Sequence, residues 1–324
     1  MLTLKDGGPF ADALVARGID VRHGHVRSRF DVRGIRDAVA IAGRELDLVV
    51  SQGLDAQIVG ALVARRVGVP LVTIHHKQPE LGMSWHRRAL TRLVARRIDR
   101  VIAVTDAQVP DLVAHGFAAD RIEVIPNGVP RPEPTRDRAA SRSTLELGAD
   151  DFVALLVAAL RPEKRAALFV AAVESAAGHD ARIRGLVAGD GPDHAAVAET
   201  ARSAVRVLGA RSDVADLIEA CDVVCLTSSA EALPMVVLEA MAGGRPVVVT
   251  DVGGVATVVE DGRTGRLLPA DVGSSLEEAL LDLARDPAAV SAMGAEARSR
   301  YEERYSSDRM ADLYALSFRR LVGE

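Results

Sequence analysis

Short runs of Val, Ile and Leu alternate with longer Ala-rich segments of helical period along the whole chain. This alternation is typical of β-α-β units, in which parallel strands form a sheet and helices cover both of its faces. In the first 130 residues it predicts helices near 55–66, 84–97 and 107–115. It predicts strands there at 21–26, 46–50, 70–74, 101–104 and 122–125.

A second region of the same kind follows a break in the pattern. Segment 126–150 contains four prolines and many charged residues, which exclude a long helix or a central strand and mark a linker. Segment 306–322 places apolar residues at helical spacing, so the chain is predicted to end in a docked helix. The strands predicted between these segments are 152–159, 183–188, 205–208, 223–226, 246–250 and 265–268.

Composition narrows the class of protein. The 324 residues are enough for about two domains, and 48% hydrophobic with 26% charged residues is typical of a globular chain. Aromatic residues make up only 3%, with a net charge of −5, so nucleic acid is not an expected partner. The chain has no apolar stretch of 18 residues and no apolar core of a signal peptide near residue 1, so we expect a cytoplasmic protein.

The two cysteines do not add a structural site. Cys221 and Cys225 lie four apart in what reads as one strand, where their sulfur atoms could not meet. We therefore predict neither a disulfide framework nor a Cys-based metal site.

Loops that follow predicted strands carry the candidate chemistry, because ligands of doubly wound sheets bind at the carboxyl ends of strands. Gly189 and Gly191 would let a ligand approach the main chain closely. The loop 228–234 leads into a helix with Pro234 in its first turn, and the free amides and dipole of such a helix start suit a diphosphate.

Two further loops lie at the same predicted sheet edge. Segment 161–165 supplies three cations, and segment 251–254 opens another helix. Each loop alone is better interpreted as a solvated turn or surface charge, but four of them at one edge favour an anion site. Glu231 and Glu239 flank the helix start, and carboxylates there would bind sugar hydroxyls.

The second domain resembles the donor-binding half of retaining GT-B glycosyltransferases of family 4. The run 231–239, EALPMVVLE, is similar to the E-x7-E motif of that family, and the strand 246–250 follows it as in the family. Segments 251–254 and 260–265 continue the pattern, and Pro126-Asn127-Gly128-Val129 resembles its domain junction. The resemblance extends from about residue 9 to the end of the chain.

The resemblance implies a role for each matching residue. Glu239 would hold the nucleotide ribose, Glu231 would contact the transferred sugar, and main-chain amides around Leu233, Pro234 and Met235 would take the diphosphate. Gly189 and Gly191 are predicted donor contacts from their place in a loop after a strand, not from the resemblance.

Lys164 matches the phosphate-binding lysine of the family. The arginine that usually precedes this lysine falls on Ala159 here, and Arg161 is its expected substitute. In the first domain His75 matches the histidine that faces the reaction centre, and we favour it over His76. Such a histidine can hydrogen-bond a sugar hydroxyl, although a turn histidine bonded to the backbone is the other interpretation.

The implied fold is α/β, with two doubly wound Rossmann-like domains facing a cleft, the GT-B fold. We predict an acceptor-side domain over 1–130, a linker over 131–150 and the donor-binding domain over 151–305. The helix over 306–324 would pack back toward the N-terminal domain.

The start of the chain departs from the family pattern. Only seven residues precede the segment 8–18, where the family has its first strand, a glycine-rich loop and a helix. In an alternative alignment Gly7 and Gly8 form that loop, with a short helix after it. We favour the first reading and expect the N-terminal domain to lack its first β-α unit, through an internal start or a natural truncation.

The resemblance implies a retaining glycosyltransferase of the hexosyltransferase class. It would move a sugar from a nucleotide-sugar donor to an acceptor hydroxyl, in polysaccharide or glycoconjugate biosynthesis, without a metal ion or cofactor. The alternative is a nucleotide-sugar-binding protein with little or no turnover. A GT-B epimerase is disfavoured, because the E-x7-E block matches the transferases better.

The acceptor is not defined by the sequence. Arg88, Arg92 and Arg96 recur every fourth residue of a predicted helix and could contact anionic head groups or the phosphate of a lipid-linked acceptor. The protein would then lie peripherally at the inner face of the membrane. A solvated helix face is the other interpretation.

Overall fold

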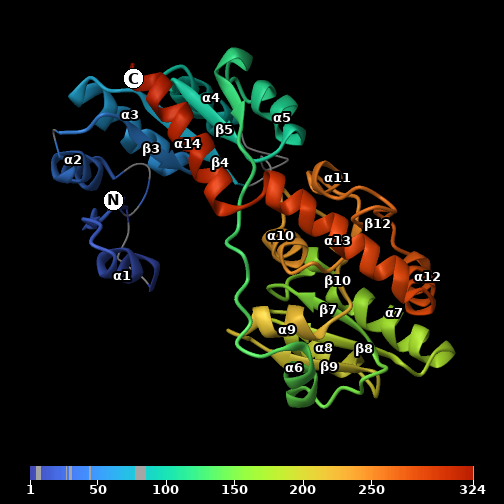
Figure 1. Ribbon diagram of the computed structural model, residues 1–324. Coiled ribbons are helices and arrows are strands. Elements are labelled where there is room, and N and C mark those ends of the chain that lie inside the picture. The colour runs from blue at the N-terminus through green and yellow to red at the C-terminus, as the bar shows by residue number, and fades with distance from the viewer. Residues whose placement is uncertain (5–8, 27, 29–30, 44, 77–84, 324) are drawn as a thin grey trace. The chain divides into compact units, whose positions relative to one another are not determined.

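The computed structural model describes residues 1–4, 9–26, 28, 31–43, 45–76 and 85–323, which form two compact units (Figure 1). The first unit comprises 1–125 and 313–324, and the second comprises 126–312. Each unit has a parallel β-sheet of its own.

The second unit is built on six parallel strands in the order β12-β11-β10-β7-β8-β9. The strand ends differ from the predicted ones by at most two residues, because continuous apolar runs are typical of strands that are buried on both faces. The strands are β7 (Phe152–Val157), β8 (Ile183–Ala188), β9 (Val205–Gly209), β10 (Val223–Leu226), β11 (Val247–Thr250) and β12 (Gly265–Leu268).

Helices cover both faces of this sheet. The chain runs outward from β7 to β9 and then returns to β10, so right-handed crossovers place the helices before and after the return on opposite faces (Figure 1). One face packs against α7 (Ala166–His179), α8 (His194–Thr200) and α12 (Ser275–Arg285). The other carries α9 (Val214–Ala220) and α10 (Met235–Ala242), and α13 (Pro287–Arg304) packs against α10.

The strand order reverses between β7 and β10, which are neighbours in the sheet. From β7 the chain moves to β8 on one side, and from β10 it moves to β11 on the other. The loops that follow these two strands therefore open side by side at the carboxyl edge. This is the place where doubly wound sheets bind their ligands.

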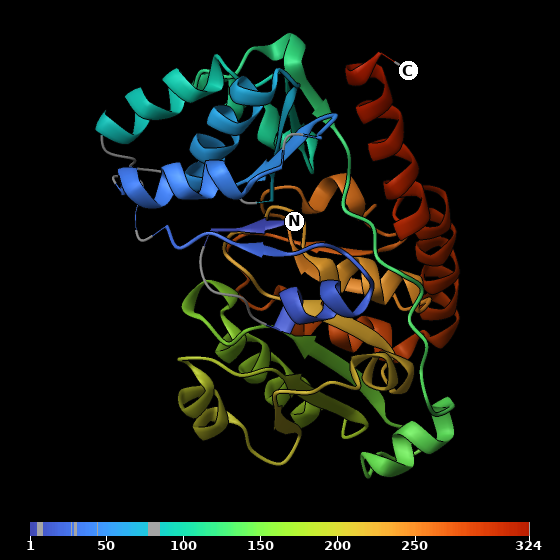
Figure 2. The same ribbon diagram turned by 90° about the vertical axis from the view of Figure 1, so that its left-hand side faces the viewer.

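The first unit contains a parallel sheet in the order β3-β4-β5-β6. Its core joins Leu71, Ile98 and Val101 to the helices α3 and α4 beside the sheet (Figures 1 and 2). The elements are β3 (Val49–Gln52), α3 (Leu54–Val67), β4 (Leu71–His75), α4 (Trp85–Ala95), β5 (Arg100–Ala103), α5 (Val109–Ala114) and β6 (Ile122–Val124), with α2 (Val32–Ile41) packed on α3.

A short β-α-β unit precedes these elements. Strands β1 (Leu2–Thr3) and β2 (Arg22–His23) pair in parallel on either side of α1 (Pro9–Ala16). We expected the first β-α unit to be lacking, whereas the structure has a rudimentary one whose two-residue strand pairs in a separate sheet. The glycine-rich loop of the alternative alignment, Gly7-Gly8, lies outside the described residues.

Part of the predicted linker is folded onto the second unit. Segment 131–150 contains the helix α6 (Arg138–Thr144), which packs against α9. Upstream of α6, Asp216 of α9 accepts hydrogen bonds from the backbone amides of Thr135 and Arg136 at 2.6 and 3.1 Å. Residues 135–144 of the predicted linker therefore pack against the second unit.

The last helix, α14 (Ser307–Val322), has its C-terminal half in the first unit. There the hydroxyl of Ser317 donates to Oε2 of Glu123, 2.6 Å away. One prediction about the second unit was wrong: Cys221 directly follows α9 and does not lie in a strand with Cys225. Ala220 and Cys221 are both apolar, and only Asp222 lies between Cys221 and β10, so the hydrophobic pattern does not show where the helix ends.

Candidate active site

Lys164 and Glu231 meet at the point where the strand order reverses. Lys164 ends a 3-10 turn in the loop after β7, and Glu231 lies in the loop after β10. Nζ of Lys164 is 2.5 Å from Oε1 of Glu231, and the hydroxyl of Ser228 donates to the same oxygen at 2.6 Å. The two charged side chains are only 22% and 10% exposed. A cation and an anion thus occupy one half-buried spot at the ligand-binding edge.

The loop that carries Glu231 is bonded to its neighbours. The amide of Ser229 donates to the carbonyl oxygen of Glu163 at 2.8 Å. The hydroxyl of Thr250, at the end of β11, donates to the carbonyl oxygen of Ser228 at 2.6 Å. These two bonds, of which the one between Thr250 and Ser228 is buried, hold the loop that carries Glu231 in place. Nothing in the motif that contains Glu231 indicates the role of Ser228 or Thr250.

The helix α10 begins directly after this loop. Leu233 and Pro234 are buried, Pro234 is the residue before the first helical turn, and Met235 is 43% exposed. Amides in the first turn of a helix lack the usual acceptor four residues back; that of Val237 donates to the carbonyl oxygen of Pro234 at 3.2 Å, and those of Met235 and Val236 are available to an anion. The amide of Gly254, in the loop after β11, donates to the carbonyl oxygen of Ala232 at 3.1 Å, which joins a third loop to this helix start.

Glu239 lies inside α10 and is half-buried. Its side chain forms no hydrogen bond with any residue that the structure describes. Burial raises the pKa of this carboxyl group above its ordinary value. The carboxylate would regain hydrogen bonds from hydroxyl groups of a ligand, which suits the predicted contact with a ribose.

The three cations of segment 161–165 have different surroundings. Arg161 is exposed, and its side chain forms no hydrogen bond among the described residues. Lys164 pairs with Glu231, and Arg165 donates to main-chain carbonyl groups. The use of Arg161 in place of an arginine at Ala159 stays a prediction.

Gly189 and Gly191 let the loop after β8 pass close to the loop after β7. A Cβ atom would lie 1.8 Å from the carbonyl oxygen of Ala158 at the first position and 2.4 Å from that of Leu160 at the second. Their φ angles are 147° and 154°. The contact that requires glycine is thus with the protein's own backbone, and the contact with a donor stays a prediction.

His75 ends β4 in the first unit and is held by side chains of the sheet layer. Nε2 of the buried Gln57 lies 2.8 Å from Oγ1 of Thr73 and 3.2 Å from Nε2 of His75, and Phe117 stacks edge-on at 5.2 Å. Burial, with smaller contributions from His115 and His76, lowers the pKa of His75 to about 4. The imidazole is therefore neutral near pH 7, with one donor and one acceptor nitrogen.

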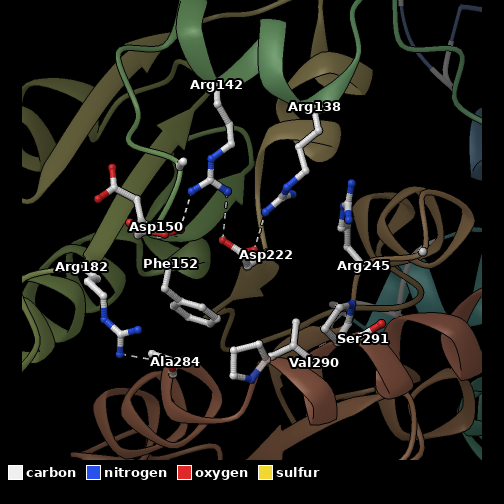
Figure 3. A pocket seen from close by; sticks show the side chains of 15 residues that line it. Arg138, Arg142, Asp150, Phe152, Arg182, Asp222, Arg245, Ala284, Val290 and Ser291 are labelled. Atoms are coloured by element: carbon white, nitrogen blue, oxygen red, sulfur yellow. Dashed lines mark hydrogen bonds and ion pairs between the residues drawn. The ribbon is translucent and has the colours of Figure 1, made fainter.

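A cavity of about 580 Å³ in the second unit lies away from these groups (Figure 3). Its lining includes Phe152, Asp222 and Pro246, which stand at the amino ends of β7, β10 and β11. Figure 3 shows Arg138 and Arg142 pointing to Asp222, with nitrogen–oxygen distances of 2.5 and 3.5 Å. These arginines fasten α6 to the sheet, so we do not assign the donor site to this cavity.

The predicted basic helix corresponds to α4. Arg92 is exposed on it, whereas Arg96 lies just past its last residue. The side chain of Arg88 is outside the described residues. Among the helices that the structure describes, none has the length and apolarity needed to span a bilayer. The described residues also contain no group of three or more His, Cys, Asp or Glu placed to hold a metal ion.

Family models match both units of the chain. Residues 151–286 match the family model described as glycosyl transferases group 1, and residues 2–128 match a glycosyl transferase 4-like domain. A D-inositol 3-phosphate glycosyltransferase of Kineococcus radiotolerans is 34% identical over 296 residues, covering 80% of this chain and 68% of that protein. One of Rhodococcus opacus is 32% identical, covering 81% and 64%. The chain spans about two thirds of the length of these relatives.

Solved structures share the fold. The crystal structure of Anabaena Alr3699/HepE in complex with UDP has a TM-score of 0.86 at 23% identity, covering 98% of this chain and 90% of that one. A sucrose-phosphate synthase of Thermosynechococcus elongatus has a TM-score of 0.77 at 22% identity, covering 90% and 77%. The two units are thus Rossmann-like domains of the GT-B fold, and the chain belongs to the group 1 glycosyltransferase family.

Proposed function

We propose that this protein transfers a sugar from a nucleotide-sugar donor to an acceptor hydroxyl, with retention of anomeric configuration. The observation that carries the proposal is the contact between Lys164 and Glu231 at the reversal of strand order. A nucleotide sugar has an anionic diphosphate joined to a hydroxyl-rich ring. The ammonium group suits the first, the carboxylate suits the second, and the bond to be broken lies where the two meet.

Each residue then has a defined task. Lys164 and the first-turn amides of α10, around Leu233 and Met235, take the diphosphate. Glu239 binds the ribose hydroxyls, and Glu231 orients the sugar. Donor binding exchanges the partners of the resting ion pair: the ammonium turns to phosphate oxygens and the carboxylate gains hydroxyl donors.

Catalysis by these groups consists of positioning and electrostatic stabilisation. Negative charge grows on the diphosphate as it leaves, and a fixed ammonium with oriented amides stabilises it without reorganisation. We assign no cofactor and no metal ion to this step. His75 is the candidate in the first unit for the group that faces the reaction centre.

The acceptor belongs to the proposal only as a class. The relatives named D-inositol 3-phosphate glycosyltransferase suggest an inositol phosphate as the first acceptor to test. The second acceptor to test is a glycoconjugate precursor, lipid-linked or free. Transfer to such an acceptor would place the protein in the cytoplasm or at the inner face of the membrane.

The test is donor turnover. UDP-glucose, UDP-N-acetylglucosamine and GDP-mannose are supplied with and without D-inositol 3-phosphate, and release of the nucleotide is followed together with the anomeric configuration of the product. We expect one donor to react and Glu239→Ala to weaken its binding by tenfold or more. Unchanged donor affinity in Glu239→Ala would refute the proposal.

A binding protein with little or no turnover is the second candidate. The short β1-α1-β2 segment favours this candidate, because its two strands pair with each other in a sheet separate from the four-stranded sheet of the first unit. Donor binding without hydrolysis or transfer, under any of the acceptor conditions, would decide for this candidate.

A further inference from the structure

Arg165 has a backbone conformation that is unusual for a residue with a side chain. It follows Lys164 directly, and its φ of 48° and ψ of 40° lie in the left-handed region. Glycine adopts this region freely, whereas a Cβ atom makes it unfavourable. Such strain persists where surrounding contacts fix the residue, so the contacts of Arg165 call for an explanation.

The guanidinium group of Arg165 donates to three main-chain carbonyl groups. Nε lies 2.6 Å from the oxygen of Thr227, Nη2 lies 2.9 Å from that of Ser228, and Nη1 lies 2.8 Å from that of Ala270. Thr227 and Ser228 follow β10 and are fully buried, and Ala270 follows β12. The planar fork of an arginine donates from three nitrogens in fixed directions and so reaches carbonyl groups of two loops at once, whereas a lysine donates from a single nitrogen.

These contacts reach both charged groups of the candidate site. The hydroxyl of Thr227 donates to the carbonyl oxygens of Lys164 and Arg165, at 3.0 and 3.1 Å. Ser228, whose carbonyl group Arg165 holds, donates its own hydroxyl to Glu231. The turn that carries Lys164 and the loop that carries Glu231 are therefore bonded to each other through Arg165.

We propose that Arg165 is a positioning residue of the donor site, an inference that rests on the proposed function. Its side chain does not touch the donor. It locks the loop after β10 to the turn after β7 and so sets where the ammonium group of Lys164 stands relative to Glu231. The left-handed backbone at Arg165 directs the guanidinium group into the gap between the two loops.

The test compares UDP with uridine in Arg165→Gly. This substitution relieves the backbone strain and removes the three hydrogen bonds. We expect the affinity for UDP to fall about tenfold, because Lys164 loses its fixed place beside the diphosphate. Uridine lacks the diphosphate, and its proposed contact, Glu239, lies on α10, so its affinity is expected to stay unchanged. If the substitution instead destabilised the second unit as a whole, the affinities for UDP and for uridine would both fall.

Two further measurements separate positioning from stability. Lys164→Ala should cost less UDP affinity in the Arg165→Gly background than in the wild type, because the lysine is already misplaced there. Millimolar methylguanidinium should restore UDP affinity to Arg165→Gly and not to Lys164→Ala. Arg245→Gly is the matched control, since Arg245 also donates to main-chain carbonyl groups, those of Ile218 and Glu219, but at the opposite edge of the sheet.

The outcomes are distinct. Wild-type UDP affinity in Arg165→Gly, or an equal cost of Lys164→Ala in both backgrounds, overturns this inference alone. Failure of the wild-type protein to bind UDP or any other nucleoside diphosphate overturns the proposed function and this inference with it. If Arg165→Gly does not fold, Arg165→Lys takes its place, with a smaller loss of UDP affinity expected and an unchanged affinity refuting the inference.

Discussion

At the scale of a single residue, Glu239 lowers the stability of the folded protein. Its carboxyl group is half-buried without a hydrogen-bond partner among the described residues, and burial raises its pKa. A raised pKa in the folded state means that the protonated form is the stabilising one. Stability is therefore complete below the ordinary pKa and falls as the pH rises through the folded value.

Glu239→Gln is expected to raise the free energy of unfolding at pH 8, because the amide carries no charge to desolvate. At pH 4 and below the gain should shrink, since the wild-type carboxyl group is then protonated. Urea unfolding at the two pH values measures both effects. Glu303→Gln, the same change at an exposed position of α13, is the matched control, and a pH-independent gain in Glu239→Gln would contradict the argument.

For His75 the expected pH dependence of stability is the opposite of that for Glu239. Its pKa is lowered from 6.5 to about 4, so the neutral form is the stabilising one. The contribution is complete above pH 6.5 and is lost as the pH falls toward 4, by up to about 3 kcal/mol. His75→Gln should flatten the decline of unfolding free energy over this interval. A decline in the variant as steep as in the wild type would show that His75 is not the titrating group. His179→Gln, the same substitution at an exposed position, is the control.

At the scale of elements, Asp216 fastens the part of the linker that precedes α6. Asp216 is 5% exposed and accepts from the amide and hydroxyl of Thr135 and from the amide and guanidinium group of Arg136. Asp216→Ala should lower the free energy of unfolding by about 2 kcal/mol, because the hydrogen bonds that the buried, charged carboxylate accepts from Thr135 and Arg136 are lost. Asp213→Ala, one turn earlier and paired with Arg211 near the surface, should cost about 1 kcal/mol or less. Equal costs in denaturant titrations would contradict this.

The strands were the most predictable elements. The strand at 223–226 agrees with β10 to the residue, because it is an apolar run with Asp222 before it and Thr227 after it. The end of α9 was not predictable, since Ala220 and Cys221 are both apolar although the helix ends between them. Helix α6 was also missed, because prolines and charges around it indicate a linker.

The site was predictable only as far as its motif. The E-x7-E spacing indicates Glu231 and Glu239, and the P-E-K sequence indicates Lys164. Arg165 and Ser228 were missed because their importance lies in bonds between loops more than 60 residues apart in sequence. Nothing in the sequence distinguishes Arg165 from other basic residues, because its main-chain carbonyl partners are known only from the structure.

At the scale of the whole molecule, the two units should respond differently to a ligand. UDP at one hundred times its dissociation constant would stabilise the second unit by about 2.7 kcal/mol. The single tryptophan, Trp85, belongs to the first unit. Thermal unfolding followed by far-ultraviolet circular dichroism should therefore show a component shifted upward by UDP, while the tryptophan fluorescence transition stays in place. A shift of equal size in both signals would show that the units unfold together.

The reversal of strand order has a consequence for how the family can vary. Lys164 and Glu231 lie in the loops that follow the adjacent strands β7 and β10, while the chain between them runs out to the edge strand β9 and back. Insertions or deletions in the segment between these two loops change its length, whereas its two ends stay joined by the contact between Lys164 and Glu231. The outer rim of the sheet is therefore free to diversify, and new surfaces can arise there while the ammonium and carboxylate groups keep their separation.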